Sequence, residues 1–591
     1  MNSYKQIISR LWRHLSKRRK KQFSILLILM VVASISELIS VGAVVPFLGI
    51  LIAPEQVYQN ALIQPVIQVL EISEPNQLIL PLTILFIIAA LTAGIIRLTL
   101  LYATTRLSYA TGADISINIY RRTLYQEYAV HVALNSSKVI NGIINKTNIV
   151  ISSILTPILM LMSSIILLIG IMVALFYIDI VVALTALIGF SFLYGMVIYY
   201  TRKQLKENSQ CIADQSTMMI KSLQEGLGGI RDVLIDGTQQ FYLQLYRNAD
   251  LPLRRASGNN QFISGSPRYA MEAIGMVLIA ILAYFMTQQK NGMAASIPVL
   301  GALALGAQRL LPVLQQAYSS YSLIKGSKSS FVDVLNLLDQ PLPEYLDQPI
   351  TKPIPFTKEI KLNNLNFRYT DDSPWVLKNV NLSLKKGCHI GFMGVTGSGK
   401  STLLDIIMGL LPGTNGELLI DQLPINNQNR RAWQAHIAHV PQNIYLSDGT
   451  IEENIAFGIE NEEIDHQRVR KAAQQAQIAE LIEQWKDGYQ TIVGERGVRL
   501  SGGQRQRIGV ARALYKKASV LIFDEATSAL DNETEQAVMD AIEGLDKELT
   551  ILTIAHRLTT LKSCDKIVKL DKNNVINILS YKEVLKLVDK K

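Results

Sequence analysis

Six long apolar runs constrain this chain more than any other feature. They cover about 23–53, 78–103, 148–178, 180–200, 270–287 and 294–315. A membrane-spanning helix needs roughly 20 apolar residues, because each residue rises about 1.5 Å across a hydrocarbon core about 30 Å thick. Charged residues make up only 18% of the chain, whereas a typical soluble domain has about 25%. The sequence therefore predicts a membrane α-helical domain of six transmembrane helices.

Basic residues predict how these helices are oriented. A basic cluster at 17–21 precedes the first run, and basic residues outnumber acidic ones in 104–147. The loop at 54–77 contains glutamates but no lysine or arginine. Because Lys and Arg accumulate on the cytoplasmic side, we expect a multi-pass protein of the cell (inner) membrane with its N-terminus and C-terminal half in the cytoplasm. The net charge of +10 is then largely an orientation signal, and we expect no nucleic-acid partner.

The two inner connections are long and keep helical patterning, so we expect the membrane helices to continue into the cytoplasm. The first 16 residues predict an amphipathic helix with an apolar stripe. Followed by the basic cluster, it is typical of an interfacial helix lying on the inner leaflet, and a helix packed on protein is the alternative. The stripe consists of Tyr4, Ile7, Ile8, Leu11, Trp12 and Leu15.

A proline-rich segment separates two parts of different composition. Residues 338–357 contain five prolines, which interrupt regular structure. Beyond them, short β-rich runs alternate with helical patterns, as in an α/β domain. We therefore predict an N-terminal interfacial helix and basic cluster at 1–22, a transmembrane domain at 23–337, a linker at 338–357 and an α/β domain at 358–591, which the motifs described next identify as a nucleotide-binding domain. The three cysteines are far apart, which excludes a disulfide scaffold, and no Cys/His spacing predicts a zinc site.

A phosphate-binding loop follows the apolar run 389–393, which predicts a buried strand. The loop reads GVTGSGKS and leads into a helical pattern, the context that a P-loop requires. Its glycines let backbone amides surround phosphate, and the helix dipole favours the negative charge. We expect Lys400 to reach the β- and γ-phosphates and Ser401 to ligate Mg²⁺. The predicted nucleotide-binding residues here are Gly394, Thr396, Gly397, Ser398, Gly399, Lys400, Ser401 and Thr402.

A second buried strand, 520–524, ends in two carboxylates. Asp524 at the strand end suits Mg²⁺ held through water, and Glu525 suits the base that polarises the attacking water. A further segment, Ser501-Gly502-Gly503-Gln504, begins a helix with small residues, which is a second anion site. Together these segments predict an ATP-hydrolysing site that uses Mg²⁺.

In this order the motifs resemble the nucleotide-binding domain of ATP-binding-cassette (ABC) transporters, over about 360–575. The resemblance adds Tyr369 as the residue that stacks on adenine, Gln442 as a Mg²⁺ contact and γ-phosphate sensor, the stretch 491–497, Asp531 after Ser-Ala-Leu, and His556 as a γ-phosphate contact. It implies that Ser501 and Gly503 contact the ATP held by the opposite subunit. Because the chain has one such domain and six spans, as in a type IV exporter-like half-transporter, the resemblance implies a homodimer or a similar partner chain.

Charged residues within the spans point to a transport pathway, because inserting each one costs about 2.5–3.5 kcal/mol. Short motifs around them resemble lipid-linked oligosaccharide flippases of the PglK type. This resemblance implies that Arg97, Arg268 and Arg309 contact a pyrophosphate-linked lipid, since guanidinium groups bind phosphate in a bidentate manner. Pairing with acidic residues for structure is the alternative. The candidate residues are Glu37, Arg97, Arg268, Glu272 and Arg309.

Two further predictions come from this resemblance. The amphipathic outer stretch 57–70 resembles a short external helix that engages a polyprenyl tail, and a loop helix packed on protein is the alternative. Cytoplasmic turns near Tyr128–Asn135 and Gln224–Gly229 are expected to touch the nucleotide-binding domains.

The sequence thus predicts an ATP-hydrolysing exporter or flippase, a translocase that moves a lipid-linked oligosaccharide or a similar anionic glycolipid. Its expected partners are membrane lipid, the lipid-linked saccharide and a second identical chain. The first alternative is an ABC exporter of another amphipathic cargo, which would be a lipid A-like lipid, a hydrophobic drug or a peptide. A nucleotide-gated channel or regulator is an alternative of a different class, and the intact Glu525 disfavours it.

Overall fold

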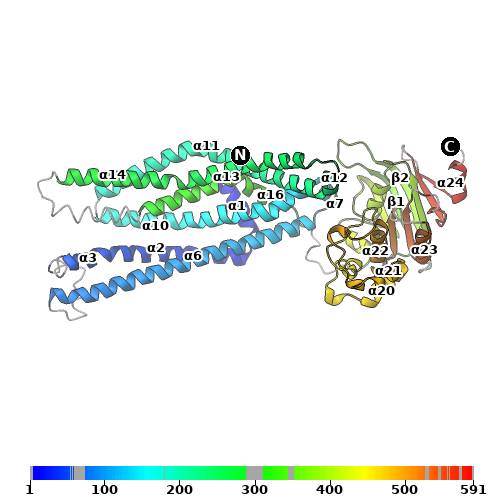
Figure 1. Ribbon diagram of the computed structural model, residues 1–591, viewed down its shortest axis with the longest axis horizontal. Coiled ribbons are helices and arrows are strands. Elements are labelled where there is room, and N and C mark those ends of the chain that lie inside the picture. Colours follow the sequence, from blue (N-terminus) through cyan, green and yellow to red (C-terminus); the bar gives the residue numbers. More distant parts are fainter. Residues whose placement is uncertain are drawn as a thin grey trace. The chain divides into compact units, whose positions relative to one another are not determined.

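The computed structural model describes residues 4–52, 55, 58, 74–178, 180–287, 310–343, 346, 352–525, 532–543, 548–555, 557, 560–571 and 576–588 (Figure 1). The chain divides into two compact units. The helical unit comprises Met1–Gln126 and Leu134–Leu342. The sheet unit comprises Pro343–Lys591 together with the short segment Glu127–Ala133.

Long helices that run alongside one another build the helical unit (Figure 1). A further helix covers 310–326. The other elements are α1 (Tyr4–His14), α2 (Lys17–Gly42), α3 (Val44–Ile52), η1 (Pro75–Leu78), α6 (Ile79–Leu124), α8 (Ser136–Asn141), η2 (Gly142–Lys146), α9 (Thr147–Val150), η3 (Ile151–Leu155), α10 (Thr156–Ile178), α11 (Ile180–Gly228), α12 (Ile230–Ile235), α13 (Gln239–Gly265), α14 (Pro267–Thr287) and α16 (Lys328–Leu338).

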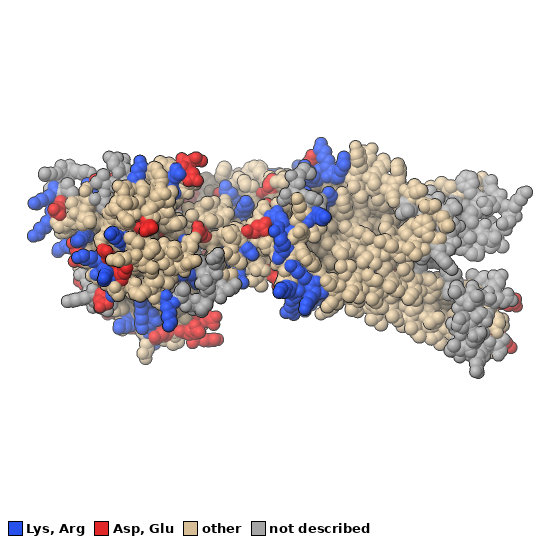
Figure 2. Space-filling model, turned by 180° about the vertical axis from the view of Figure 1, so that it is seen from behind, with Lys and Arg blue, Asp and Glu red and all other residues tan. Residues whose placement is uncertain are grey.

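The predicted apolar runs lie on these helices. Within the described residues, three helical stretches are long and apolar enough to cross a membrane: Lys17–Ser40, Pro75–Leu124 and Ser136–Val173. The fourth and fifth runs lie on α11 and α14, and most of the sixth lies outside the described residues. Figure 2 shows a wide surface without charged side chains, bordered at one end by Lys and Arg. This arrangement matches a lipid-facing surface with basic residues at its cytoplasmic boundary.

Two of the membrane helices continue far beyond their apolar runs, as the helical patterning predicted. Helix α6 has 46 residues and α11 has 49. At 1.5 Å per residue each is about 70 Å long, more than twice the thickness of a hydrocarbon core. The predicted external helix at 57–70 lies outside the described residues, apart from Tyr58.

Helix α1 packs on protein along part of its apolar stripe. Ile7, Leu11 and Leu15 are buried, and the first two join a core cluster with residues of α6 and α16. At the end of α16, Asp339 accepts hydrogen bonds from Arg10 (Nη2 to Oδ2, 2.5 Å). Ile8 and Trp12 of the same stripe are 43% and 44% exposed. Part of the stripe therefore packs on protein, and the placement of this helix on the inner leaflet stays a prediction. The basic cluster forms the first turn of α2 rather than a separate segment.

A buried ion pair joins two segments of the helical unit that are far apart in sequence. Lys146 ends the π-helical turn η2, and its ammonium lies 2.5 Å from a carboxylate oxygen of Asp333 in α16. The Lys146 side chain is 3% exposed, whereas that of Asp333 is 32% exposed. Gly142 in the same turn also lies against α16, because an added Cβ would come within 2.3 Å of Leu337.

The unequal burial of this pair predicts unequal effects of breaking it. D333N leaves the buried ammonium of Lys146 without a countercharge, so we expect a loss of about 3 kcal/mol in unfolding free energy. K146M leaves only a carboxylate that water reaches, so a smaller loss is expected. Thermal denaturation of the purified variants measures both effects. The double variant K146M/D333N should be more stable than D333N alone, and equal losses in the two single variants would contradict this account.

Two sheets form the framework of the sheet unit within its described residues. The first is antiparallel, in the order β2-β1-β4-β5, and the second has the order β10-β9-β3-β8-β7-β6. In the second sheet β9, β3, β8, β7 and β6 are parallel, and β10 pairs antiparallel at the edge. The strands are β1 (Glu359–Phe367), β2 (Leu377–Lys385), β3 (His389–Gly394), β4 (Asn415–Ile420), β5 (Leu423–Pro424), β6 (Ile437–Val440), β7 (Val520–Asp524), β8 (Thr550–Ile554), β9 (Lys566–Leu570) and β10 (Ile576–Leu579).

Two large apolar cores flank the second sheet. Helices close one of them, and the helix at 400–407 and strands of the first sheet close the other. The central strands β3, β7 and β8 are almost continuously apolar, as expected for parallel strands buried on both faces. The helices are α7 (Tyr128–Ala133), α17 (Lys400–Ile407), α18 (Arg430–Gln434), α19 (Ile451–Ile455), α20 (His466–Gln475), α21 (Ala479–Gln484), α22 (Gly502–Tyr515), α23 (Asn532–Glu543) and α24 (Tyr581–Val588), with 3₁₀ turns η5 (Asn461–Glu463), η6 (Gly488–Gln490) and η7 (Glu495–Gly497).

Candidate functional site

The P-loop, Gln442 and the Asp524-Glu525 pair lie at one edge of the parallel sheet. Strand β3 ends at the P-loop, β6 ends two residues before Gln442, and β7 ends at Asp524. The register pairs Asp524 with Ile554, so the carboxyl end of β8 lies beside that of β7. Because the carboxyl ends of parallel strands share an edge, this is where an open α/β sheet binds its ligand.

The P-loop has the geometry of a phosphate cradle. Gly399 has φ +91°, a conformation that favours glycine, and it caps the N-terminus of α17. Gly394 lies so close to β9 that an added Cβ would come within 2.4 Å of the Leu570 carbonyl oxygen. The buried Ser398 hydroxyl has no hydrogen-bond partner within the described part of the chain. A polar atom of this kind beside a helix N-terminus fits a phosphate group.

Lys400 lies under this loop, with 7% of its surface exposed. Its ammonium donates hydrogen bonds to the carbonyl oxygens of Gly394 (2.8 Å) and Val395 (3.2 Å). Burial lowers the pKa of Lys400, while the nearby negative charges of Glu525 and Asp524 act in the opposite direction. The ammonium therefore lies between the P-loop and the two carboxylates, where it can bind phosphate oxygens.

Glu525 is held in position by its backbone and by Gln442. Its φ is +52°, which is strained for a residue other than glycine and is frequent at functional sites. Gln442 Nε2 donates a hydrogen bond to Glu525 Oε2 at 2.8 Å. The structure thus brings together two residues predicted to be catalytic that are 83 positions apart.

Tyr369 lies beside the P-loop helix. Its hydroxyl is 3.0 Å from the Thr402 hydroxyl, and its ring packs edge-on against Phe367. The side chain is about half exposed, so one face is available to a flat ligand. This position suits the predicted stacking on adenine.

The segment Ser501–Gln504, predicted to be a second anion site, forms a helix cap. Ser501 is the N-cap of α22, and the Ser501 and Gln504 side chains each accept a hydrogen bond from the other's backbone amide. Gly502 and Gly503 form the first turn. Among the described residues, no hydrogen bond links Ser501 or Gln504 to the P-loop. The roles predicted for Ser401 and Thr396 stay predictions, and the predicted residues Asp531, His556 and Arg309 lie outside the described residues.

One carboxylate of this region gave no signal in the sequence. Burial, reinforced by the charge of Asp524, raises the pKa of Asp405 in α17 to about 6. The ordinary pKa of an Asp side chain is about 3.9. The folded state therefore binds more protons than the unfolded state between about pH 4 and pH 6. Stability falls as the pH rises through that range, because the ionised form is disfavoured by burial.

D405N should therefore make the sheet unit more stable than the wild type at pH 7.5, by about 2 kcal/mol. This advantage should shrink as the pH falls through 6 and vanish below about pH 4, where the wild-type carboxyl becomes protonated in the unfolded state as well. Denaturation followed by the fluorescence of the sheet unit's tryptophans measures it. D372N, at an exposed position, is the matched control, and a D405N advantage that does not depend on pH would contradict the assignment.

The short segment Glu127–Ala133 clusters with the sheet unit, as expected for the turn predicted near Tyr128–Asn135. Glu127 Oε1 lies 3.3 Å from Arg430 Nη2 at the start of α18. Burial raises the pKa of the Tyr128 hydroxyl, and the negative charge of Asp405 adds to this effect. The contact between Glu127 and Arg430 had no sequence signal, because the residues are 303 positions apart. The other predicted turn, Gln224–Gly229, belongs to the helical unit.

The predicted substrate arginines that the structure describes line two hollows within the helical unit. The first, of about 540 Å³, contains Arg97 and Glu37, whose side chains lie 3.1 Å apart. The second, of about 570 Å³, contains Arg268 and Glu272, which lie 2.8 Å apart. We name them the α6 hollow and the α14 hollow. The pairing that was left open as an alternative therefore exists in both, although both arginine side chains are 63% exposed.

The two hollows adjoin each other. Met160 and Gln316 line both of them. Further polar groups of the α14 hollow come from Ser319, Ser320 and Gln315. The sequence did not single out these residues, because uncharged polar side chains occur on many helices and only packing shows which of them face a hollow.

Comparisons with known proteins cover both units. The ABC transporter family matches residues 377–528, and the ABC transporter transmembrane region matches residues 44–305. An ATP-dependent lipid A-core flippase of Chromohalobacter salexigens is 32% identical over 399 residues, 66% of this chain and 67% of that protein. A protein of the same name in Cupriavidus metallidurans is 26% identical over 505 residues, 84% of this chain and 83% of that protein.

A solved structure, a bacterial Atm1-family ABC exporter with ATP bound, has the same fold. It covers 97% of this chain and 96% of its own, with a TM-score of 0.77 and 21% identity. The predicted fold class, a membrane α-helical domain fused to an α/β ATPase domain, is confirmed. The protein is an ATP-hydrolysing membrane protein with a cytoplasmic ATPase domain. The chain belongs to the ABC transporter family, as an exporter that carries a transmembrane region and an ATPase domain on one polypeptide.

Proposed function

We propose that this protein is a flippase that uses ATP to translocate an anionic amphipathic glycolipid of the lipid A kind. The observation that carries the proposal is the pair of adjoining hollows in the helical unit, each containing an arginine–glutamate pair. The curated relatives, which share sequence with both units, are lipid A-core flippases and support this choice of cargo.

The chemistry of the hollows fits a charged saccharide head group. The mostly exposed guanidinium groups of Arg97 and Arg268 can each donate bidentate hydrogen bonds to a phosphate. Gln315 Oε1 in the α14 hollow is buried without a hydrogen-bond partner in the described part of the chain, although its Nε2 donates to Ser264 O. An orphan acceptor of this kind is satisfied by a hydroxyl donor, which sugars provide.

The lipid-linked oligosaccharide is the second candidate cargo. A pyrophosphate linkage would meet the same two guanidinium groups, and its sugars the same amides and hydroxyls. The curated relatives favour the lipid A-like cargo over it. For either cargo, the proposed transporter has the same head-group site and uses the same ATP hydrolysis.

Hydrolysis relies on the residues at the sheet edge. Glu525 polarises the attacking water. Gln442 orients the Glu525 carboxylate by donating a hydrogen bond to one of its oxygens. Lys400 neutralises negative charge on the phosphates. Ser401, Gln442 and Asp524 would hold Mg²⁺, which supplies further charge neutralisation when bound.

We propose that two identical chains form the working transporter. The capped N-terminus of α22 is an anion site, and its side chains have no hydrogen bond to the P-loop of the same chain within the described residues. A second copy would place its own α22 against the phosphates bound at this P-loop. Each ATP would then lie between two chains.

A test of the cargo compares the two lipids in nanodiscs of zwitterionic lipid. We expect lipid A to stimulate ATP hydrolysis at a lower concentration than a pyrophosphate-linked oligosaccharide lipid, and an uncharged glycolipid to have little effect. Stronger stimulation by the oligosaccharide lipid would favour the lipid-linked oligosaccharide as the cargo. Equal stimulation by the uncharged glycolipid would contradict an anion-selective cargo site.

A further inference from the structure

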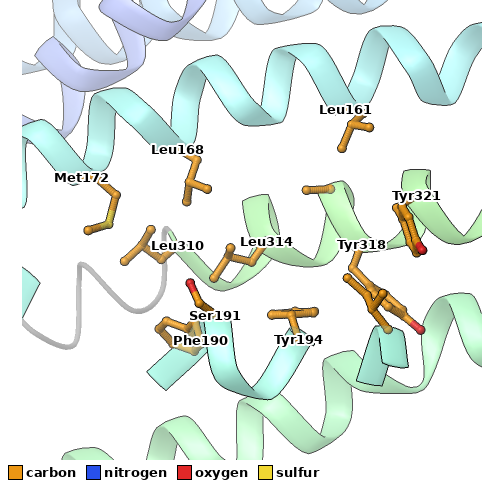
Figure 3. Close-up of a pocket in the computed structure, with 12 residues that line it drawn as sticks. Leu161, Leu168, Met172, Phe190, Ser191, Tyr194, Leu310, Leu314, Tyr318 and Tyr321 are labelled. Atoms are coloured by element: carbon orange, nitrogen blue, oxygen red, sulfur yellow. The ribbon is translucent and has the colours of Figure 1, made fainter. Parts of the chain in front are cut away.

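An apolar pocket of about 300 Å³ lies among α10, α11 and the helix at 310–326 (Figure 3). Leu161, Leu168 and Met172 point into it from α10, and Leu310 and Leu314 come from the helix at 310–326 (Figure 3). Phe190 closes it from α11. Among the described lining residues, the polar side chains are Ser191 and the tyrosines. Its volume is at the lower end of small-molecule sites, which range over about 300–1,000 Å³.

This pocket borders the α14 hollow at Tyr194. The Tyr194 side chain lines both spaces and packs against the Tyr318 ring at a centroid distance of 5.6 Å. Tyr194 is 8% exposed, and its hydroxyl has no hydrogen-bond partner among the residues that the structure describes. An apolar compartment therefore adjoins a polar, charged one across a wall that carries an unsatisfied hydroxyl.

We propose that this pocket holds an acyl chain of the cargo lipid while the head group of the same molecule lies in the adjoining hollows. The inference rests on the proposed function, because it takes the cargo to be an amphipathic lipid. A chain with an anionic saccharide head matches both compartments at once. A chain of a neutral membrane lipid would match only the apolar one. The described residues that line the pocket all belong to one chain, so it is a subsite within each subunit.

Two neighbouring residues on α10 provide a matched test. Leu168 lines the pocket, whereas Ile169 is 59% exposed on the outer surface. L168W fills the pocket with a ring and excludes methylene groups of the chain, and excluding two or three of them weakens binding about ten-fold or more. The measurement is the lipid A concentration that half-maximally stimulates ATP hydrolysis by the full-length protein in nanodiscs. We expect L168W to raise it at least ten-fold and I169W to leave it within about two-fold.

A second pair of measurements keeps the test independent of folding. L168A enlarges the pocket, so we expect it to shift the preference toward lipid A with longer acyl chains. The head group freed of its acyl chains should show the same affinity for L168W as for the wild type, because it does not enter the pocket. Equal effects of L168W and I169W, or a loss of head-group affinity in L168W alone, would overturn the proposal.

Direct labelling separates a failure of this inference from a failure of the proposed cargo. A lipid A derivative with a diazirine at the end of one acyl chain is photolysed on the wild-type protein. We expect cross-links at Met172 and Phe190 that excess lipid A removes. Cross-links only at exposed residues such as Ile169 would overturn the pocket while leaving the cargo in place. If lipid A neither stimulates nor competes, the cargo assignment fails. In that case the diazirine is placed on a single-chain phosphate amphiphile. Cross-links at Met172 and Phe190 would support the pocket as an acyl-chain site, and cross-links only at exposed residues would overturn it.

Discussion

E525Q should reduce steady-state ATP hydrolysis roughly 10²–10⁴-fold, the usual contribution of a positioned base. The amide keeps the size of the carboxylate but cannot accept a proton from the attacking water. Binding of a fluorescent ATP analogue should persist, because the P-loop and Tyr369 are the residues predicted to supply most of the contacts. Hydrolysis by the purified protein and analogue binding are measured on the same preparation.

The matched control is E417Q, at an exposed position of β4, which should hydrolyse ATP at the wild-type rate. Because Gln442 donates to Glu525, Q442A should lower the rate by less than E525Q. ATP hydrolysis by E525Q at the wild-type rate would show that Glu525 is not the base that polarises the water. Loss of analogue binding would instead indicate a disrupted nucleotide site.

R268A should raise the lipid A concentration for half-maximal stimulation about ten-fold or more. Hydrogen bonds to charged groups are worth roughly 1.5–3 kcal/mol, and the variant loses those made to a phosphate. Its partner Glu272 is 44% exposed, so losing the arginine leaves no buried charge and the fold should persist. R268K should restore affinity only partly, because lysine lacks the planar fork. Stimulation curves and thermal denaturation of the same preparations measure both effects.

Arg97 requires a different design, because its partner Glu37 is only 18% exposed. R97A removes the ion pair of this mostly buried carboxylate and should destabilise the protein, whereas R97Q/E37Q removes both charges together. We expect the double variant to be as stable as the wild type and to bind lipid A at least ten-fold more weakly. R254A, which breaks a similar pair on α13, is the control. Wild-type affinity in both R268A and R97Q/E37Q would defeat the proposed head-group site.

Much of the nucleotide site could be predicted from the sequence, because its chemistry lies in short contiguous motifs. The P-loop and the Asp524-Glu525 pair each follow a buried strand, and parallel strands bring their carboxyl ends to one edge. The membrane runs were equally readable, since length and hydropathy decide whether a helix can span a bilayer.

Packing between segments that are distant in sequence could not be predicted. Helix α1 carries an amphipathic pattern that suits both a lipid surface and a protein groove. Only the structure shows that Ile7 and Leu11 pack on protein, while Ile8 and Trp12 remain exposed. The raised pKa of Asp405 depends on how α17 lies beside Asp524. The apolar pocket requires side chains from three helices, and its residues resemble any other membrane leucines in sequence.

The central claim is that ATP hydrolysis at Glu525 moves an anionic glycolipid across the membrane. The most direct test follows fluorescent lipid A in proteoliposomes that contain either the wild-type protein or E525Q. The account predicts that Mg-ATP makes the label change leaflets with the wild-type protein, and that neither E525Q nor wild type without ATP moves it. ATP-dependent movement of an uncharged glycolipid but not of lipid A, or equal movement by E525Q, would contradict it.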